Sequence, residues 1–379
     1  MPVIVAYCRA GFEAEALADL AAVATAAGTT ISGDAATGSG FVVARPRVFD
    51  AQRWPRALEA APPVFVRALF FGTGPHVLFD PATTRGRPNR VAPLAVLVRA
   101  LRQESGLPGV PHAQRAAMMF SELRVEMPDT NDGKALSGVC RGVDLPLAAE
   151  LLADGALAEA DDAHHGRSPL PVLHVFFVSG TEVYLGVSAA PWGSAYAMGI
   201  PRLHLPRGAP SRSTLKLAEA IAVFLGDREG ELLHAGMKAV DLGAAPGGWT
   251  WQLAQRGLRV IAVDNGPLKG DVADDPRVNH QRVDGLSYLP RRPVDWMVCD
   301  MVEQPSRIAT LVGRWLAEGH ARRSIFNLKL PMKKRHAEML RCRAIIDDAL
   351  SRTHARHRLQ LRQLYHDREE ITGFVERIG

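Results

Sequence analysis

The sequence predicts an α/β protein whose C-terminal half is a doubly wound parallel sheet and whose N-terminal half is an α+β region. Three observations lead to this prediction. A chain of 379 residues is long enough for two or three domains. The segment 196–212 holds three prolines and two glycines without apolar periodicity, which is typical of a linker. After this segment short apolar strands alternate with loops and helices, whereas before it strands and helices mix without a regular period.

In the N-terminal half, short apolar runs bounded by turn residues predict strands, and two segments with helical periodicity predict helices. Two of the runs flank Gly180 and predict a hairpin, since strand-forming residues lie on both sides of a glycine-containing turn. The predicted strands are 2–7, 40–44, 63–71, 121–129, 172–178 and 182–188, and the predicted helices are 11–27 and 93–104.

In the C-terminal half, five short apolar runs predict the strands of a parallel sheet, followed by a closing hairpin at 359–378. One helix is predicted at 246–257, with Pro246 early in it and Gly257 ending it. The five predicted strands are 238–243, 259–264, 280–285, 295–300 and 323–330.

The composition excludes several protein classes. Apolar residues make up 47% and charged residues 22% of the chain, as in ordinary globular proteins. No apolar run approaches the ~20 residues of a membrane-spanning helix, and the start lacks the features of a signal peptide. The four cysteines lie far apart without C-x-x-C spacing, so we expect no disulfide scaffold, no metal site and a cytoplasmic location.

The excess of basic residues is concentrated in one segment. The net charge is +5, yet residues 1–212 carry 19 basic and 19 acidic side chains, so the whole excess follows them. Residues 320–368, here called the basic segment, hold 13 basic and 4 acidic side chains. Phosphate contacts of a nucleic acid would use such a segment, although a solvated helix surface is the alternative.

Charged residues end each of the five predicted strands of the C-terminal half. In a doubly wound sheet ligands bind outside the carboxyl ends of the strands, where the strand order reverses. A single acid after a strand is usually a turn former or helix cap, but five charged groups in register are hard to explain in that way. These residues are Asp241, Asp264, Asp284, Asp300 and Lys329.

The glycine-rich loop after the first of these strands favours one class of cofactor. It reads Gly-Ala-Ala-Pro-Gly-Gly at 243–248 rather than G-x-G-x-x-G, and its proline removes an amide donor that a pyrophosphate would use. A nucleoside without phosphates, such as S-adenosylmethionine, suits this loop. Asp264 lies 23 residues after Asp241, an offset at which an acid accepts hydrogen bonds from ribose hydroxyls. Asp284 would meet the adenine amino group and Asp300 the sulfonium end.

The segment DLGAAPGGWTWQL, which begins at Asp241, resembles the first motif of the FtsJ-type RNA ribose 2′-O-methyltransferases. These enzymes use a Lys–Asp–Lys–Glu tetrad, and the resemblance places it at Lys216, Asp300, Lys329 and a glutamate of DREEIT. Glu369 and Glu370 both fit, and the position directly before the strand ITGFV favours Glu370. The strings SRSTLKL, WMVCDMVEQP and FNLKLPMKKR resemble a narrower family, the bacterial 23S rRNA cytidine 2′-O-methyltransferases.

The resemblance covers nearly all of 211–379 and implies a Rossmann-like methyltransferase domain at 213–379 that uses S-adenosylmethionine. It also implies a ferredoxin-like domain at 1–92, a THUMP-like RNA-binding domain at 93–195 and the linker at 196–212. The implied partner is 23S rRNA or its precursor, without membrane or required protein partner, so we expect a monomer. The implied cofactor-binding residues are Ser213, Asp241, Gly243, Ala245, Pro246, Gly247, Gly248, Trp249, Asp264, Asp284 and Asp300.

The chemistry of ribose methylation gives the tetrad residues separate roles. The hydroxyl must be placed in line with the methyl group and relieved of its proton. Burial and a second nearby cation lower the pKa of a lysine from its ordinary ~10.4. We therefore expect Lys329 to act as base or as hydroxyl-orienting group, with Lys216 tuning it and the two carboxylates holding both. The alternative is that both lysines are surface residues or phosphate binders.

Other functions remain as alternatives or are disfavoured. No cysteine follows a proline, as base C5 methylation would require, and Asp300 is not followed by the Pro-Pro-aromatic run of amino methyltransferases. A catalytically idle RNA-binding protein of ribosome assembly would not need a complete tetrad. A small-molecule methyltransferase would leave the basic segment without a role.

Overall fold

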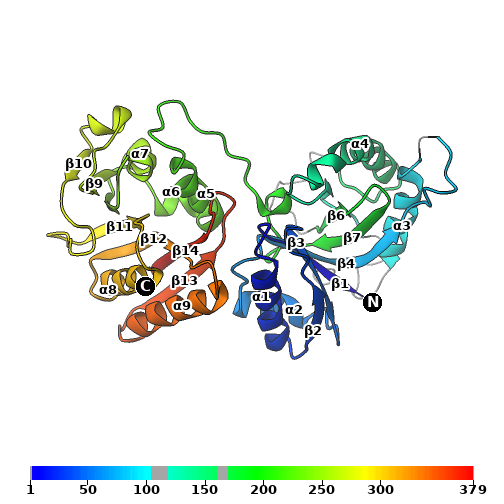
Figure 1. The fold of residues 1–379 in the computed structure, drawn as a ribbon, viewed down its shortest axis with the longest axis horizontal. Coiled ribbons are helices and arrows are strands. Elements are labelled where there is room, and N and C mark those ends of the chain that lie inside the picture. The colour runs from blue at the N-terminus through cyan, green and yellow to red at the C-terminus, as the bar shows by residue number, and fades with distance from the viewer. Residues whose placement is uncertain (1, 87, 104–117, 160–169, 379) are drawn as a thin grey trace. The chain divides into compact units, whose positions relative to one another are not determined.

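The computed structural model describes residues 2–86, 88–103, 118–159 and 170–378. The chain divides into two compact units, Met1–Ile200 and Pro201–Gly379, each built around its own seven-stranded sheet (Figure 1).

In the N-terminal unit the strand order is β2-β3-β1-β4-β7-β6-β5, and neighbours run antiparallel except β5, which is parallel to β6. Strand β1, an interior strand of this sheet, is buried along its whole length. The elements are β1 (Val3–Tyr7), α1 (Glu13–Ala26), β2 (Ile31–Asp34), β3 (Phe41–Pro46), α2 (Arg53–Ala60), β4 (Ala68–Val77), α3 (Val91–Gln103), β5 (Glu122–Glu126), α4 (Ser137–Ala153), β6 (Val172–Phe177) and β7 (Glu182–Ser188), with short 3₁₀ helices at Gly133–Leu136 and Ala197–Gly199.

The strand predicted at 63–71 is displaced in the structure, where β4 begins only at Ala68. The carboxylate of Asp19 on α1 accepts hydrogen bonds from the backbone N–H groups of Val64 and Phe65, at 2.7 and 2.6 Å. Because these donors bind a helix side chain, Val64 and Phe65 do not join the sheet.

The predicted hairpin is confirmed, since β6 and β7 pair antiparallel. Strand β4 also pairs with β7, so one continuous sheet includes strands from both sides of residue 92. The division into separate regions at residue 92 stays a prediction.

In the C-terminal unit the strand order is β10-β9-β8-β11-β12-β14-β13. The first five of these run parallel, as predicted, and β14 runs antiparallel to both β12 and β13. The elements are α5 (Thr214–Phe224), α6 (Glu229–Leu232), β8 (Lys238–Leu242), α7 (Gly248–Gln255), β9 (Arg259–Val263), β10 (Val278–Gln281), β11 (Val294–Cys299), α8 (Pro305–Ala317), β12 (Ala321–Lys329), α9 (Arg335–Ser351), β13 (Arg356–Arg362) and β14 (Glu370–Ile378), with 3₁₀ turns at Gly226–Arg228 and Gly270–Ala273.

Two boundaries differ from the sequence prediction. Helix α7 begins at Gly248, so Pro246 lies in the loop before the helix rather than within its first turn. Strand β10 ends at Gln281, which leaves Asp284 in the loop that follows.

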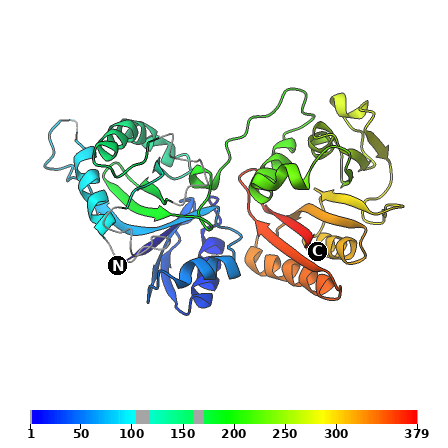
Figure 2. The ribbon, with the colours of Figure 1, turned by 180° about the vertical axis from the view of Figure 1, so that it is seen from behind.

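Helices cover both faces of the C-terminal sheet, with α5, α6 and α7 on one side and α8 and α9 on the other (Figures 1 and 2). On the first side the ring of Trp296 on β11 stacks on Phe374 of β14 at 6.0 Å between centroids. On the second side, Gly313 of α8 lies so close to α9 that a Cβ there would meet the Cβ of Ala349 at 2.8 Å.

The order of the parallel strands reverses between β8 and β11. From β8 the chain adds β9 and then β10 on one side, and it returns to place β11 on the other side of β8. Such a reversal opens a crevice outside the carboxyl ends of the two central strands, where ligands bind in doubly wound sheets. The glycine-rich loop follows β8 and Asp300 follows β11, so both lie at this crevice.

Candidate active site

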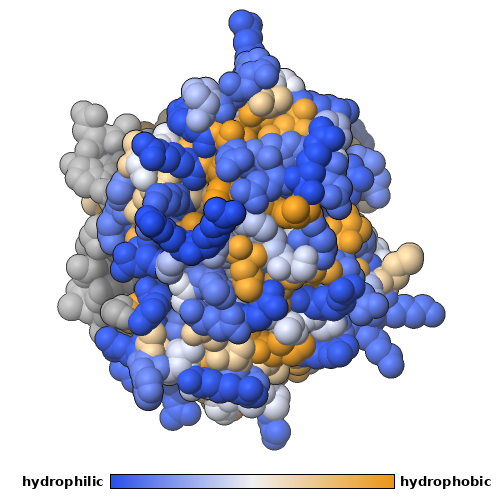
Figure 3. All heavy atoms as spheres, turned by 90° about the vertical axis from the view of Figure 1, so that its left-hand side faces the viewer, coloured by the Kyte–Doolittle hydropathy of each residue, from blue (hydrophilic) through white to orange (hydrophobic). Residues whose placement is uncertain are grey.

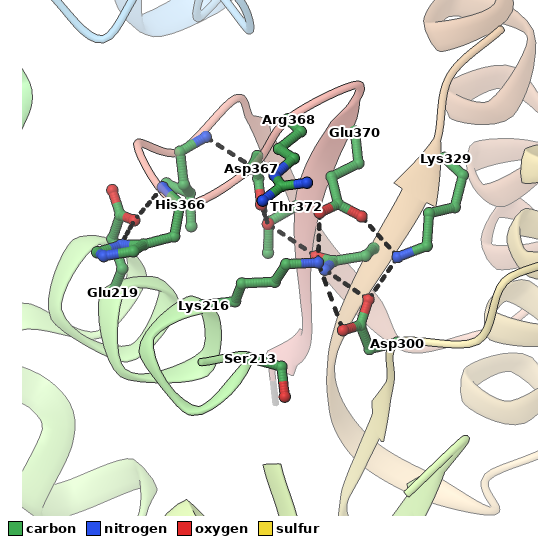
Figure 4. A network of polar contacts seen from close by, with 12 residues as sticks. Ser213, Lys216, Glu219, Asp300, Lys329, His366, Asp367, Arg368, Glu370 and Thr372 are labelled. Atoms are coloured by element: carbon green, nitrogen blue, oxygen red, sulfur yellow. Dashed lines mark hydrogen bonds and ion pairs between the residues drawn. The ribbon is translucent and has the colours of Figure 1, made fainter. Parts of the chain in front are cut away.

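Four charged side chains, here called the tetrad, form a closed ring of ion pairs at the carboxyl ends of β11 and β12 (Figure 4). The Nζ of Lys329 lies 2.6 Å from Oδ1 of Asp300 and 2.5 Å from Oε2 of Glu370. The Nζ of Lys216 lies 3.5 Å from Oδ2 of Asp300 and also pairs with Oε1 of Glu370. Each lysine thus contacts both carboxylates, and the structure brings together all four residues of the expected tetrad.

Local structure explains why the four side chains converge. Lys329 is the last residue of β12 and Glu370 the first of β14, and the two are directly opposite each other in the antiparallel register. Cross-strand partners place their side chains on the same face of the sheet. Asp300 follows β11, the neighbour of β12, and Lys216 comes from the first turn of α5.

The surroundings of Lys329 act on its pKa in two directions. Burial lowers the pKa of Lys329, but the carboxylates of Asp300 and Glu370 raise it by more, so the pKa lies above its ordinary value. The expected lowering by burial and a second cation is therefore outweighed, because each ammonium of the ring has two carboxylate partners. In this arrangement Lys329 carries a proton at neutral pH.

A chain of hydrogen bonds from buried residues orients the carboxylate of Asp300. The side-chain amide of Asn327 donates to Oδ1 of Asp300 at 2.9 Å, and the hydroxyl of Thr372 donates to Oδ1 of Asn327 at 2.8 Å. Thr372 also lies 2.9 Å from Oδ2 of Asp367, a fully buried carboxyl whose pKa burial raises well above its ordinary value. Because all these groups except Asp300 are buried, the orientation of Asp300 depends on the interior of the sheet.

Glu219 ties α5 to the loop that leads into β14. Its carboxylate is fully buried and accepts hydrogen bonds from the backbone N–H groups of Tyr365 and His366, at 2.7 and 2.8 Å. Its Oε2 also lies 2.6 Å from Nδ1 of the His366 ring. Since Lys216 lies one turn earlier on the same helix, this contact fixes Lys216 relative to Glu370.

Glu370 and Glu369 have different environments. The carboxylate of Glu370 is 7% exposed and pairs with both lysines, whereas that of Glu369 is 53% exposed and pairs with Arg335 at 2.9 Å. Successive residues of a strand point to opposite faces, so only one of the two can face the ring.

The glycine-rich loop has a backbone that only glycine adopts readily. Gly243 and Gly247 have φ angles of +80° and +114°, in the left-handed region that side chains rarely enter. A Cβ at Gly248 would collide with Oγ of Ser213, so the loop packs tightly against the segment before α5. Ser213, Gly243, Ala245 and Pro246 are partly exposed, whereas Gly247 and Gly248 are buried.

Asp264 and Asp241 shape this loop from two sides. Asp264 accepts hydrogen bonds from the N–H groups of Ala245 and Gly266, at 3.0 and 2.7 Å. Asp241 accepts from the hydroxyl of Thr250 at 2.6 Å through Oδ2, but its buried Oδ1 has no partner within the described residues. Burial raises the pKa of Asp241 to about 7.

The loop and its acids fit S-adenosylmethionine in chemical terms. Carboxylates suit a ligand that offers ribose hydroxyls and a positive charge, and carboxylate oxygens retain lone pairs for such donors. Asp284 lies exposed in its loop, with Oδ1 accepting the N–H of Leu286 at 3.2 Å. Trp249 lies on α7, is 3% exposed and packs in the hydrophobic core. A contact from Trp249 to a ligand would therefore come from its backbone.

Sequence reasoning missed Asn327, Thr372, Asp367 and Glu219. A signal existed for one of them, because Asn327 is a polar residue two positions before Lys329 in an apolar strand and therefore shares its face. The other three act through partners far away in the sequence and carry no local signal.

The basic segment is spread over several elements. Lys333, Lys334 and Arg368 are exposed and follow or precede tetrad members closely in sequence. Arg335 pairs with Glu369, and Arg358 pairs with Glu376 on the neighbouring strand. None of the helices that the structure describes combines the length and apolar character needed to cross a bilayer.

Three family descriptions match successive parts of the chain. Residues 1–70 match the RlmM ferredoxin-like domain, and residues 108–189 match the N-terminal region of ribosomal RNA large subunit methyltransferase M. Residues 209–323 match the FtsJ-like methyltransferase family.

Similarity to named proteins extends over nearly the whole chain. The Ribosomal RNA large subunit methyltransferase M of Azoarcus sp. is 44% identical over 98% of this chain and 95% of its own length. The protein of the same name from Methylococcus capsulatus is 44% identical over 99% of this chain and 98% of its own length. That from Stutzerimonas stutzeri is 40% identical over the full length of both. With its tetrad, its glycine-rich loop and this full-length similarity, the chain belongs to the ribosomal RNA large subunit methyltransferase M family.

Proposed function

We propose that this protein transfers a methyl group from S-adenosylmethionine to the ribose 2′-oxygen of a cytidine in 23S rRNA. The observation that carries the proposal is the closed ring of Lys216, Asp300, Lys329 and Glu370 beside the glycine-rich loop. Two lysines and two carboxylates in mutual contact form an overall neutral site that holds each ammonium group in a fixed position.

The geometry at Lys329 supports a role in orienting the hydroxyl. An ammonium group has three N–H donors, and Lys329 directs two of them to Asp300 and Glu370. The third donor is left for a substrate oxygen, and the side chain is 26% exposed, so a ribose can reach it. The 2′-oxygen would be held there with its remaining lone pair toward the incoming methyl group, which is the alignment that this reaction requires.

The proton of the 2′-hydroxyl must leave as the oxygen–carbon bond forms. Lys329 can accept it only after giving its own proton to a partner or to solvent, because its pKa lies above the ordinary value. Its hydrogen bonds to Asp300 and Glu370, at 2.6 and 2.5 Å, provide two carboxylates to which that proton could pass. The tetrad thus combines a donor that positions the hydroxyl with acceptors adjacent to it.

S-adenosylmethionine supplies an electrophilic methyl group on a sulfonium. The residues that would hold it are the partly exposed loop residues Gly243, Ala245 and Pro246, together with Asp264 for the ribose hydroxyls. Asp300 contributes negative charge that is favourable near a sulfonium and an amino group, and Asp241 offers its buried Oδ1, which has no partner within the described residues, as an acceptor.

Exposed side chains beside the tetrad support RNA as the substrate. Val302 and Met332 are 89% and 86% exposed, and each follows a tetrad member by two or three residues. Large apolar side chains at a catalytic edge suit the face of a nucleobase. The exposed Lys333 and Lys334 next to Met332 suit the flanking phosphates, which position an RNA without reading its sequence.

We further propose that residues 93–195 contribute a THUMP-like RNA-binding domain and that the protein acts as a monomer in the cytoplasm. All four tetrad side chains come from one chain, which supports a site that needs no second subunit. Four free cysteines among the described residues are compatible with a reducing compartment.

The experiment compares Lys329→Ala with Lys333→Ala, an exposed lysine four residues further on. Methyl transfer to 23S rRNA from cells lacking the protein is followed by label incorporation and by mapping 2′-O-methyl sites. We expect Lys329→Ala to abolish transfer while S-adenosylmethionine binding, measured by calorimetry, survives. Lys333→Ala, which removes only a proposed phosphate contact, should retain transfer at saturating rRNA. Unchanged turnover in Lys329→Ala would overturn the role of the tetrad. Tight RNA binding by the unmodified protein with no methyl transferred would favour the idle RNA-binding protein instead.

A further inference from the structure

A cavity of about 950 Å³ opens at the end of the C-terminal sheet opposite the tetrad. Its walls include Lys238, Arg259 and Val294, the first residues of β8, β9 and β11, whereas the tetrad lies after the last residues of the strands. Strand β11 has six residues, and at ~3.3 Å per residue the two ends of the sheet are about 20 Å apart. The lining also follows β10 to its last residue, Gln281, but β10 is the edge strand and lies three strands from β11. The cavity is therefore separate from the crevice that holds the tetrad.

The crossover that borders the cavity has no α-helix. Residues 282–293 connect β10 to β11 through turns alone, whereas α7 connects β8 to β9 and α8 connects β11 to β12. The β9–β10 edge is thus covered by a loop rather than by a packed helix. Figure 3 shows the face of the C-terminal unit on this side, where apolar surface is exposed between strongly hydrophilic side chains.

The lining combines cationic side chains with apolar surface. Four of its basic side chains, Lys238, Arg259, Arg291 and Arg292, are exposed, and no Asp or Glu occurs among the described residues that line the cavity. Val260, Ile261 and Tyr288 contribute apolar walls, and the ring of Tyr288 lies 6.5 Å from that of Trp315 on α8.

One further lining arginine is already neutralised. The Nε and Nη2 groups of Arg277 donate to the two carboxylate oxygens of Asp275, at 2.9 and 2.7 Å. The Arg277 side chain lowers the pKa of Asp275, so this pair stays charged on both sides and adds no net charge. The positive charge of the cavity therefore rests on Lys238, Arg259, Arg291 and Arg292.

We infer that this cavity binds the phosphodiester backbone of a second segment of the RNA whose ribose is methylated at the tetrad. The inference rests on the proposed function. Guanidinium groups bind phosphate oxygens through paired N–H donors, and an apolar wall with an aromatic ring suits a base or sugar next to the phosphate. A site about 20 Å from the tetrad would contact RNA beyond the neighbours of the target nucleotide.

RNA fits this cavity better than an acidic protein surface. The substrate already supplies a dense row of negative charges, and its binding at the tetrad places other parts of the same molecule near the C-terminal unit. Arg291 and Arg292 are adjacent in sequence and both exposed, so both are available to phosphates of one strand.

The experiment removes positive charge from the cavity with the double variant Arg291→Gln/Arg292→Gln. The matched control, Asp275→Asn/Arg277→Gln, removes the ion pair of the lining residue Arg277 without changing the net charge. Binding of protein-free 23S rRNA is measured at several salt concentrations, and KM and kcat are measured with saturating S-adenosylmethionine. Thermal melting verifies that both variants fold, and Arg259→Gln serves as a second variant should the first be unstable.

We expect the slope of log affinity against log salt concentration to fall in magnitude by about 1.4, because each phosphate contact to a single strand contributes about 0.7. KM for rRNA should rise several-fold with kcat unchanged, and the control should behave like the unmodified protein. An unchanged slope and KM in a folded variant would overturn the inference. A defect seen with ribosomal particles but not with protein-free rRNA would also overturn it and indicate an acidic protein partner. Absence of methyl transfer by the unmodified protein would instead contradict the proposed function, while the salt slopes would still decide on the cavity.

Discussion

Lys329 and Glu370 are directly opposed residues of the antiparallel strands β12 and β14, and their side chains meet at 2.5 Å between Nζ and Oε2. The ion pair is therefore set by the hydrogen-bonded register of the sheet rather than by the conformation of a loop. Asp300, which follows the neighbouring strand β11, reaches the same lysine at 2.6 Å. A site assembled on three adjacent strands is held more rigidly than one assembled on loops.

The register predicts different effects for two adjacent glutamates. We expect Glu370→Gln to lower kcat by at least about 10²-fold, since it removes a charge that holds both lysines in place. Glu369→Gln should change kcat by less than about twofold, because its exposed pair with Arg335 contributes little. Single-turnover methylation of rRNA measures both. Equal losses in the two variants would contradict the assignment of Glu370 to the tetrad.

The protonation of Lys329 predicts the pH dependence of the reaction. Burial lowers its pKa but Asp300 and Glu370 raise it by more, so the ammonium form persists through pH 9. If this form orients the hydroxyl, log kcat should be flat between pH 7 and pH 9. A base that must first lose its proton would instead give a rise of about tenfold per pH unit. A slope near one in the pH–kcat profile would therefore disprove the orienting role.

The same shift determines how the Lys329 ion pairs contribute to stability. A lysine whose folded pKa is raised contributes stability that is complete below the unfolded value of ~10.4 and is lost as the pH rises through the folded value. The contribution is thus present throughout the neutral range.

Asp241 predicts a loss of stability with rising pH in a lower pH window than Lys329. Burial raises its pKa to about 7, so between the unfolded value of ~3.9 and about 7 the folded state binds more protons than the unfolded state. The free energy of unfolding should therefore fall as the pH rises through this window. We expect Asp241→Asn to remove part of this fall, as measured by urea unfolding at pH 5 and pH 8. Asp295→Asn, an acid on the same sheet that is more exposed, serves as control. An identical pH dependence in Asp241→Asn and the unmodified protein would contradict this account.

The exposed apolar pair beside the tetrad predicts a defect in RNA binding. Val302→Ala with Met332→Ala should raise KM for rRNA about fivefold, or about 1 kcal/mol, the scale of partly burying two apolar side chains. Binding of S-adenosylmethionine should be unaffected. Leu340→Ala, which truncates an apolar side chain 50% exposed on α9, should leave KM unchanged. Steady-state kinetics measures KM for both variants. An equal rise in KM for Leu340→Ala would show that the effect is not specific to the tetrad edge.

The local pattern of the sequence was sufficient to predict most strands of the C-terminal sheet. Strand β12 ends in Lys329 and strand β11 is followed at once by Asp300, and short apolar runs of this kind are visible without any knowledge of the fold. Helices α8 and α9 escaped prediction. Helix α9 is rich in charged residues around a narrow apolar stripe, Met339, Cys342, Ile346 and Leu350, which becomes recognisable only once the sheet it covers is known.

The boundaries that shifted have a common cause in long-range contacts. The strand expected at 63–71 begins at Ala68 because Asp19, more than 40 residues earlier, binds the N–H groups of Val64 and Phe65. No propensity within the segment contains that information.

The sequence by itself determined which chemical groups are available at the carboxyl ends of the strands: the lysines, the carboxylates and the glycines that allow a φ of +80° at Gly243. Only the tertiary structure decided how they act. It selected Glu370 over Glu369 through the β12–β14 register, and it recruited Asn327 and Glu219 as supports. It also raised the pKa of Lys329 instead of lowering it. The physical reason is that residue type and strand periodicity are local properties, whereas pairing register and the balance of burial against charge depend on residues brought together from distant parts of the chain.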